Sequence, residues 1–474
     1  MIDLDYLANV RPSHRQYAWQ QLELYGFVHF GMNTMTGREW GTGEEDPGLF
    51  DPPDLDADEW AAPLAAAGMR GLILTAKHHD GFCLWPSRYS EHTVAASPWR
   101  QGRGDVVREV ADACARHGLK FGVYLSPWDR AEPTYGSGTA YDDVYVGQLV
   151  ELLTGYGDIF AVWLDGANGE GPNGKRQTYD WPRYYRTIRA LQPGAVICVC
   201  GPDVRWCGNE AGQTRPDEWS VVPRALQDVE RIAERSQQVD DGAFSRTIRS
   251  DDRDLGSRTA LTARPGDLVW YPAEVNTSIR PGWFHHPEED SQVRDVDELF
   301  DIYQRTVGGN STLLLNVPPT REGRIAEPDR RTLAGLGRRI AALRDAAVPA
   351  TDITFSSRPA DPAALTSLAN DVGHWLPAAA DLHPWLELTL PGRTVLDGIV
   401  LKEQITVGQR IEEVHIDIHD GEQWQPVTKT GAVGYQRILR FAPIAAEAVR
   451  VAVVRTRLAP ALAAVVPLAA QPSS

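Results

Sequence analysis

One pattern recurs along the first three quarters of the chain: a helical segment, then Gly or Pro, then a short apolar run rich in β-branched and aromatic residues. Four consecutive units have this form, with helical and apolar parts at 56–69 and 70–82, 105–118 and 119–129, 144–157 and 158–168, and 181–194 and 195–203. Further strands are predicted at 25–33, 266–276 and 311–319, with a helix at 295–309. Alternation of this kind is typical of parallel crossover units, so the sequence predicts an α/β fold.

The number of repeats favours a closed barrel over an open sheet. About seven or eight βα units fit into the first part of the chain, which matches a (β/α)8 barrel of the TIM type. The alternative is an open doubly wound sheet, which would carry a Gly-rich phosphate loop after its first strand. The segment after residues 25–33 has no such loop. In a barrel, polar residues that follow the strands gather at one mouth.

The pattern changes after a helix at 328–345 and a linker of small residues and proline. Beyond it lie short alternating segments without long helices, at 385–390, 395–405, 411–420, 437–442 and 448–456. This alternation is the signature of an antiparallel β-sandwich. We therefore expect a catalytic barrel over residues 1–347 and an accessory β-sandwich domain over residues 348–474.

Charge and composition exclude several classes of partner. The chain has 64 acidic and 47 basic residues and a formal charge of −17, which disfavours nucleic acid and anionic membranes. The opening residues lack the pattern of a secretory signal, so a cytoplasmic location is expected, with secretion by another route left open. The sequence leaves the oligomeric state undetermined. Its five cysteines lack paired metal-ligand spacing, and we predict neither a metal site nor a cofactor.

Acidic residues at strand ends are the candidate catalysts. Asp165 directly follows an apolar run and should point into the barrel mouth, although it could instead cap the following turn. Glu210 lies between glycines near a tryptophan, and Glu274 follows a later apolar run. Cleavage of a glycosidic bond needs one carboxylate as nucleophile or base and a second carboxyl as acid. By spacing alone, Glu210 and Glu274 are equal candidates for the second role.

Other polar and aromatic residues at predicted strand ends suit a sugar. His78 and His79 are adjacent, and a neutral imidazole offers one donor and one acceptor to hydroxyl groups. Either histidine could instead be a core residue. His29 is a similar polar group, and Glu39 beside Trp40 pairs a carboxylate with a plane on which a sugar ring can stack.

Five motifs, HFGMNT, REWG, KHHDGF, GVYLSPWD and VWLDGANG, occur in an order and spacing that resemble the family 29 glycoside hydrolases, the retaining α-L-fucosidases. The resemblance covers roughly residues 15 to 320 and implies that Asp165 is the nucleophile. It also implies a set of fucose-binding residues: His29, Glu39, Trp40, His78, His79, Tyr124, Trp163 and Trp283.

The resemblance also favours Glu210 as the acid/base, because RWCGNEAG is similar to the segment that carries it in the branch acting on α-1,3- and α-1,4-linked fucose. Glu274 would then help to hold substrate. The implied partner is a fucosylated oligosaccharide. Two alternatives remain: a broader fucosidase that accepts α-1,2, α-1,6 and aryl fucosides, and a glycan-binding protein without catalysis.

Overall fold

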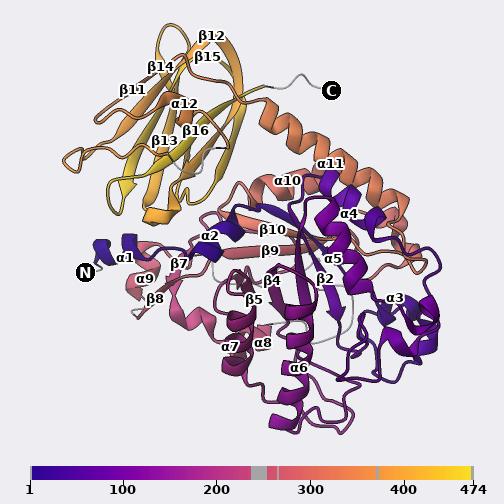
Figure 1. Cartoon of the computed structure of the whole chain (residues 1–474). Helices are drawn as coiled ribbons and strands as arrows, with labels where there is room; N and C mark the ends of the chain where they lie inside the picture. Colours follow the sequence, from indigo (N-terminus) through magenta and orange to yellow (C-terminus); the bar gives the residue numbers. More distant parts are fainter. Residues whose placement is uncertain (1–2, 236–253, 264–265, 370–372, 471–474) are drawn as a thin grey trace.

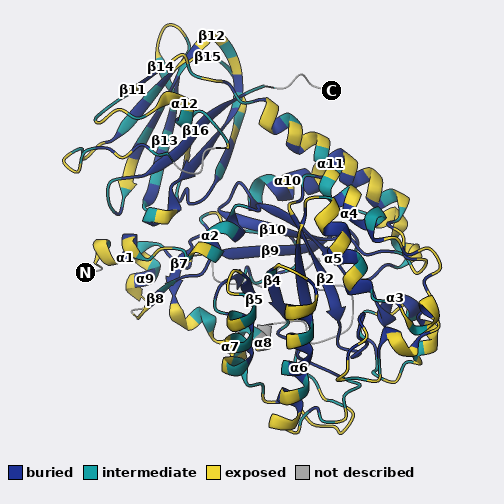
Figure 2. Ribbon diagram, viewed as in Figure 1, coloured by how far each residue is buried: buried dark blue, intermediate teal, exposed yellow. Residues whose placement is uncertain are grey.

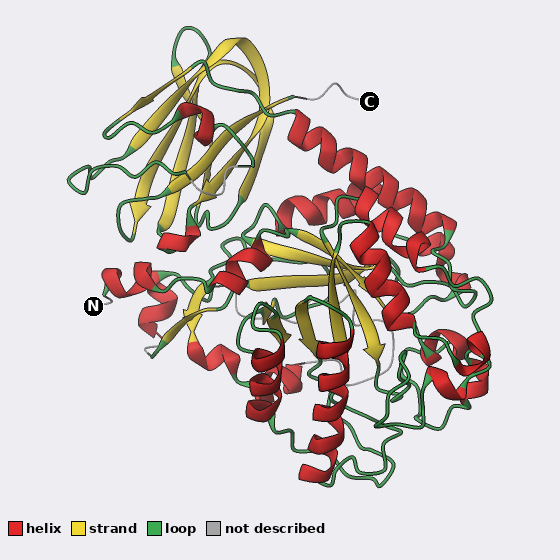
Figure 3. Cartoon of the chain, viewed as in Figure 1, coloured by secondary structure: helices red, strands yellow, loops and turns green. Residues whose placement is uncertain are grey.

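The computed structural model describes residues 3–235, 254–263, 266–369 and 373–470, which form a helix-covered barrel and a second, almost entirely β domain (Figure 1; Figure 3). Eight parallel strands make the barrel sheet, in the order β5-β4-β3-β2-β1-β10-β9-β6. Their bounds are β1 Leu24–Val28, β2 Gly71–Lys77, β3 Lys120–Leu125, β4 Ile159–Leu164, β5 Val196–Val199, β6 Arg205–Trp206, β9 Ala273–Ser278 and β10 Ser311–Asn316. The predicted barrel fold is confirmed.

The two ends of this sheet meet between β5 and β6. The backbone N–H of Val199 donates to the carbonyl of Val204 across 3.1 Å, and Cys198 and Val204 form a parallel bridge. Val204 precedes β6, so the sheet is nearly closed. Strands β2, β9 and β10 are buried along their whole length (Figure 2), as expected where helices cover the outside and side chains fill the inside.

Helices surround the barrel and present an exposed outer side to solvent (Figure 2). In α5, Val106–Arg116, the side chain of Asp105 accepts the Arg108 N–H, and the buried face includes Val107, Val110 and Cys114. The other helices near the barrel are α1 Leu4–Asn9, α2 His14–Gln20, α3 Met32–Thr36, α4 Ala57–Ala66, α6 Thr139–Gly155, α7 Trp181–Leu191, α8 Val229–Arg235, α9 Arg258–Ala263, α10 Val296–Thr306 and α11 Glu327–Asp345. Within the described ranges, no helix combines the length and apolar character needed to cross a membrane.

The segment 266–276 differs from its prediction as one strand. It forms β8, Leu268–Trp270, which pairs antiparallel with β7, Val221–Pro223, and then β9 in the barrel. Pro272 lies between β8 and β9, where it cannot donate to a strand ladder. A second departure from regular alternation is that β6 follows β5 after five residues, 200–204, without an intervening helix.

The C-terminal domain is a set of antiparallel strands in the order β11-β12-β15-β13-β14, with β16 paired to β12. Its strands are β11 Asp352–Phe355, β12 Trp385–Glu403, β13 Ile411–His419, β14 Trp424–Thr430, β15 Arg437–Thr456 and β16 Leu462–Ala469. The domain also contains the short α-helix α12 Pro362–Leu365 and the 3-10 helix Ile405–Val407. The predicted segments 385–390 and 395–405 join into β12, and 437–442 and 448–456 join into β15. Register shifts interrupt the pairing of β12 with β15 between Thr389 and Thr394 and between Leu396 and Gly398. These irregularities break the alternation of apolar residues, so each long strand appeared in the sequence as two short ones.

The barrel and the C-terminal domain share one apolar core cluster. Val400 of β12, Ile438 of β15, and Val466 and Leu468 of β16 belong to the same buried cluster as the barrel residues. Polar contacts add to this interface: the side chain of Asn310 accepts the N–H of Tyr435 across 2.7 Å and donates to a barrel-side carbonyl. The C-terminal domain is therefore packed against the barrel as part of its structure.

Candidate active site

A cavity of about 610 Å³, its open mouth included, lies at the carboxyl ends of the barrel strands. A cavity of this size, with aromatic walls and a few polar groups, is typical of a small-molecule site. Its lining residues are Phe27, His29, Glu39, Trp40, His78, His79, Tyr124, Trp163, Asp165, Gly166, Ala167, Val199, Trp206, Glu210, Asn276 and Trp283. Every site residue predicted from the sequence lines this cavity except Glu274.

Asp165 is the first residue after β4, and its side chain is 21% exposed in the cavity. Its two oxygens have different surroundings. Oδ1 accepts the backbone N–H of Ala167 across 2.8 Å. This is the turn-capping contact that the sequence analysis gave as the alternative to a catalytic role. Oδ2 accepts the hydroxyl of Tyr124 across 2.9 Å and lies 3.9 Å from Nε2 of His79. Asp165 therefore caps its turn with one oxygen and presents the other to the cavity.

Glu210 lies four residues beyond β6 and is half-buried. The indole N–H of Trp283 donates to its Oε2 across 3.0 Å. Trp283 comes from the segment after β9, so this contact joins two neighbouring strand ends. Glu210 and Asp165 thus place two carboxyl groups on the wall of one cavity.

Glu274 lies inside β9, below the cavity, and its side chain is fully buried. Its Oε1 accepts the indole N–H of Trp163 across 2.8 Å, and its Oε2 shares a hydrogen bond with the hydroxyl of Tyr25. Burial raises the pKa of this carboxyl to about 7, while the contacts with Tyr25 and Trp163 oppose the increase. Glu210 and Glu274 therefore differ in position. Glu210 lines the cavity, whereas Glu274 lies in the barrel core and contacts the cavity-lining residue Trp163.

Three histidines on the cavity wall are uncharged near neutral pH. Burial lowers the pKa of His29 to about 3 and that of His79 to about 4, with the carboxylate of Asp165 partly opposing the second decrease. Burial also holds the pKa of His78 well below its usual range. Neutral imidazoles can each donate one hydrogen bond and accept another, which suits sugar hydroxyls.

The hydrogen-bond network defines which nitrogen carries the proton in His79. The hydroxyl of Ser126 donates to the carbonyl of Trp128 across 2.6 Å, so it accepts from Nδ1 of His79, 2.7 Å away. Nε2 of His79 is then the acceptor.

Hydrogen bonds also define which nitrogen carries the proton in His29. The amide nitrogen of Asn316 donates to Oγ of Ser278 and to the carbonyl of Trp283, which turns its oxygen toward Nδ1 of His29, 2.8 Å away. Nδ1 therefore donates, and Nε2 is left as an acceptor. Both imidazoles offer the same kind of group to a ligand.

Aromatic side chains form much of the remaining wall. Trp163 stacks on Tyr124 with ring centroids 5.4 Å apart and an interplanar angle of 29°. Trp40 meets His79 and Trp128 edge-on, at 5.8 and 5.3 Å. Such surfaces pack against the apolar C–H faces of a sugar ring while the polar groups contact its hydroxyls.

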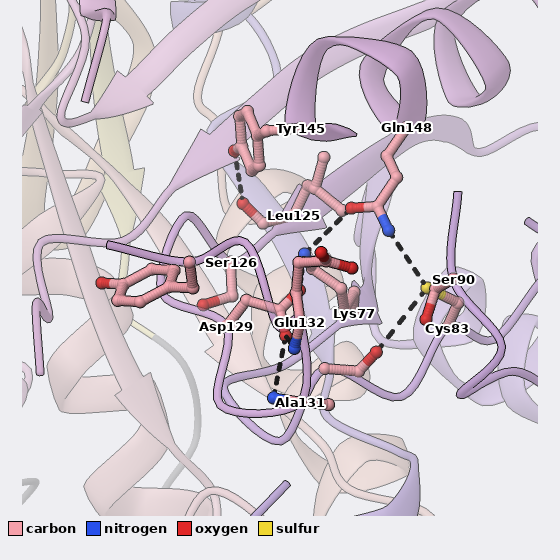
Figure 4. Close-up of polar contacts among 12 residues, drawn as sticks. Lys77, Cys83, Ser90, Leu125, Ser126, Asp129, Ala131, Glu132, Tyr145 and Gln148 are labelled. Atoms are coloured by element: carbon pink, nitrogen blue, oxygen red, sulfur yellow. Dashed lines mark hydrogen bonds and ion pairs between the residues drawn. The ribbon is translucent and has the colours of Figure 1, made fainter. Parts of the chain in front are cut away.

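Lys77, which directly precedes His78 and His79, belongs to a buried polar cluster with Asp129 and Gln148 (Figure 4). Nζ of Lys77 lies 2.6 Å from Oδ2 of Asp129 and 2.9 Å from Oε1 of Gln148, and all three side chains are buried. Asp129 follows β3 and also accepts the backbone N–H groups of Ala131 and Glu132 through Oδ1. The cluster therefore ties the end of β2 to the loop after β3.

Several contributors were not among the site residues predicted from the sequence. Trp206 and Asn276 line the cavity and contact each other, with the indole N–H donating to the amide oxygen across 2.9 Å. Asn316 and Ser126 orient the histidines from behind. For Asn316 and Ser126 the sequence signal was the one used for Asp165, a polar residue at the end of an apolar strand.

The assembled chemistry consists of three cavity-lining carboxyl groups, those of Glu39, Asp165 and Glu210, together with neutral imidazoles and aromatic planes. This arrangement can bind an uncharged polyhydroxylated ring and cleave an acetal, which requires a carboxylate and a carboxylic acid. Among the described residues, no group of three or more His, Cys, Asp or Glu side chains is placed to hold a metal ion.

Comparison with known proteins gives a consistent result over most of the chain. The sequence profile of the α-L-fucosidase family matches residues 17–342. α-L-Fucosidase 1 of Arabidopsis thaliana is 38% identical over 443 residues, which are 91% of this chain and 81% of that protein.

Solved structures agree in fold over nearly the whole chain. A Bacteroides ovatus protein assigned provisionally as an α-L-fucosidase superposes with a TM-score of 0.86 at 42% identity, over 99% of this chain and 76% of that one. A family 29 fucosidase of Ruminococcus gnavus in complex with fucose superposes with a TM-score of 0.82 at 27% identity, over 98% and 95% of the two chains.

Proposed function

The chain belongs to the α-L-fucosidase family of glycoside hydrolases, and from this premise we propose that it releases terminal α-1,3- and α-1,4-linked L-fucose from oligosaccharides with retention of configuration. The observation that carries the proposal is the placement of Asp165. Its Oδ2 is held by the hydroxyl of Tyr124 at the wall of a cavity lined by neutral imidazoles.

In the proposed first step, Asp165 attacks the anomeric carbon while Glu210 donates a proton to the leaving glycosidic oxygen. The bond to the leaving group breaks as the fucosyl–Asp165 ester forms. In the second step Glu210, now a carboxylate, takes a proton from water. That water attacks the anomeric carbon and releases fucose and the Asp165 carboxylate.

The neutral histidines support the binding part of the proposal. Nε2 of His29 and of His79 are acceptors, so they suit donating hydroxyl groups of a fucose ring. Trp283, Trp40 and Trp163 supply the apolar faces. Glu274 would act through Trp163 and not on the glycosidic bond, because Trp163 and Tyr25 engage its two oxygens.

Covalent trapping tests the role of Asp165. A 2-fluoro fucosyl donor with a good leaving group should form a stable adduct, because the fluorine slows the second step. Peptide mass spectrometry should locate the adduct at Asp165, and Asp165→Ala should lose at least about 10⁴-fold in kcat while still binding fucose. An adduct on another carboxylate would refute the nucleophile assignment.

Linkage preference is tested separately. Fucose release from a Lewis-type trisaccharide, with α-1,3 or α-1,4 fucose, should exceed release from 2′-fucosyllactose at equal concentration. Equal rates would support a broad fucosidase instead. Binding of either glycan with no release over hours would support a lectin.

A further inference from the structure

Glu39, on the loop after α3, accepts hydrogen bonds from the backbone of the segment that carries Trp283. Its Oε2 accepts the backbone N–H of Trp283 across 2.8 Å, and its Oε1 accepts that of Phe284 across 3.2 Å. The approach is so close that a Cβ atom at Gly282 would lie 2.5 Å from Oε1. Glu39 therefore holds the backbone of this segment from one side, and a side chain at position 282 would displace the Glu39 carboxylate.

The opposite side of the same segment is also held. The amide of Asn316 donates to the carbonyl of Trp283 across 2.8 Å, and Oγ of Ser278 donates to the carbonyl of Gly282 across 2.7 Å. With its backbone fixed from both sides, Trp283 directs its indole N–H at Oε2 of Glu210. The direction of the Glu210 carboxyl thus depends on contacts made behind Trp283.

His286 completes this arrangement and was not recognised from the sequence. Its Nε2 lies 2.9 Å from Oε1 of Glu39, and both side chains are largely buried, at 14% and 11% exposure. A carboxylate only accepts, so Nε2 of His286 is the donor. The hydrogen bond to Glu39, with the nearby carboxylates of Glu289 and Glu288, raises the pKa of His286, while burial opposes the increase.

We propose that His286 is a positioning residue for the acid–base steps: it orients Glu39, which holds the backbone of Trp283, whose indole orients the Glu210 carboxyl. The inference rests on the proposed role of Glu210. This positioning role adds no chemical step to the proposed two-step reaction. It predicts that removing the His286 donor weakens proton transfer to the leaving oxygen more than it weakens fucose binding.

The test uses a series of aryl fucosides with leaving groups of increasing pKa. For His286→Leu, kcat/KM should fall about tenfold or more on the poorest leaving group and no more than about twofold on a dinitrophenyl fucoside, which needs little protonation. His286→Gln places an amide donor near the position of Nε2 and should restore most of the loss. His286→Asn is too short to reach Glu39 and should behave like His286→Leu, so it replaces that variant if the leucine chain does not fold.

The C-terminal domain offers a matched control. Nε2 of His415 lies 3.0 Å from Oε1 of Glu413, a more exposed His–Glu pair in the other domain, and His415→Leu should leave the whole series unchanged. Glu210→Gln should show the steepest dependence on the leaving group. If Glu210→Gln is steep and His286→Leu loses equally on all substrates or not at all, the positioning role is wrong. If Glu210→Gln is itself independent of the leaving group, the acid/base assignment fails, and this inference fails with it.

Discussion

The hydroxyl of Tyr124 donates to Oδ2 of Asp165 across 2.9 Å, at the point where the ends of β3 and β4 meet. The same ring is stacked on Trp163, whose indole N–H reaches Glu274 beneath the cavity. The position of the proposed nucleophile is thus set by a layer of side chains that extends from the cavity wall into the barrel core.

Removing this hydroxyl should impair the chemistry directly. In Tyr124→Phe the Asp165 carboxylate loses a charge-assisted hydrogen bond, which is worth about 1.5–3 kcal/mol, so kcat/KM on an aryl fucoside should fall about 10- to 100-fold. The control is Tyr156→Phe, which removes a hydroxyl that donates to Oδ2 of Asp105 across 2.9 Å, a tyrosine–carboxylate contact outside the cavity lining. An unchanged rate in Tyr124→Phe would show that the contact has no part in the reaction.

The raised pKa of Glu274 should make the free energy of unfolding depend on pH. Its pKa is about 7 in the folded protein against a usual value of 4.5, so the folded state binds the extra proton between these values. This contribution to the free energy of unfolding is fully present below pH 4.5 and is lost as the pH rises through 7.

Glu274→Gln should remove that loss without abolishing activity. The glutamine oxygen can accept from Trp163, and its amide can donate to Tyr25, as the protonated acid would. Thermal unfolding of both proteins from pH 4.5 to 8 measures the difference. If Glu274→Gln instead abolished fucose release from natural glycans and spared aryl fucosides, Glu274 would be the acid/base.

The buried pair of Lys77 and Asp129 should be costly to break. Lys77→Met leaves the Asp129 carboxylate buried without its cation, and the free energy of unfolding should fall by about 3–5 kcal/mol in urea titrations. Arg330→Met provides the exposed comparison, since Arg330 is 42% exposed and its ion pair with Glu59 should contribute no more than about 1 kcal/mol. Similar small losses in both variants would contradict the role assigned to the buried cluster.

The barrel and the C-terminal domain should unfold together. Leu468 of β16 is fully buried in the cluster shared with the barrel, so Leu468→Ala should lower the stability of the whole chain by about 2–5 kcal/mol. Calorimetry should show one transition that moves to lower temperature as a unit. Two transitions, of which only one moves, would mean that the shared cluster does not couple the domains.

The repeat pattern was sufficient to predict the barrel and the sandwich, because hydrophobic period and helix-stop residues report on local structure. It was insufficient at 266–276, where Pro272 divides an apolar run whose two halves join different sheets. That error placed Glu274 beyond a strand end, whereas it lies inside β9.

Long-range contacts account for the other omissions. The link between Trp283 and Glu210, and that between Glu39 and His286, join residues 73 and 247 positions apart. No local pattern in a single sequence encodes such pairs. Position after a strand predicted Asp165 as a candidate, but only the folded chain shows which of its oxygens faces the cavity.

The uncharged state of the cavity histidines has a consequence for inhibition. The lining includes the carboxyl groups of Glu39, Asp165 and Glu210 and, among the described residues, neither lysine nor arginine. Because the imidazoles add no positive charge, the cavity should prefer a cationic six-membered ring to a neutral ring of the same shape. Fucose-shaped amines with a protonated ring nitrogen are therefore expected to bind more tightly than fucose, most strongly at a pH where these carboxyl groups are ionised and the ring nitrogen still holds its proton.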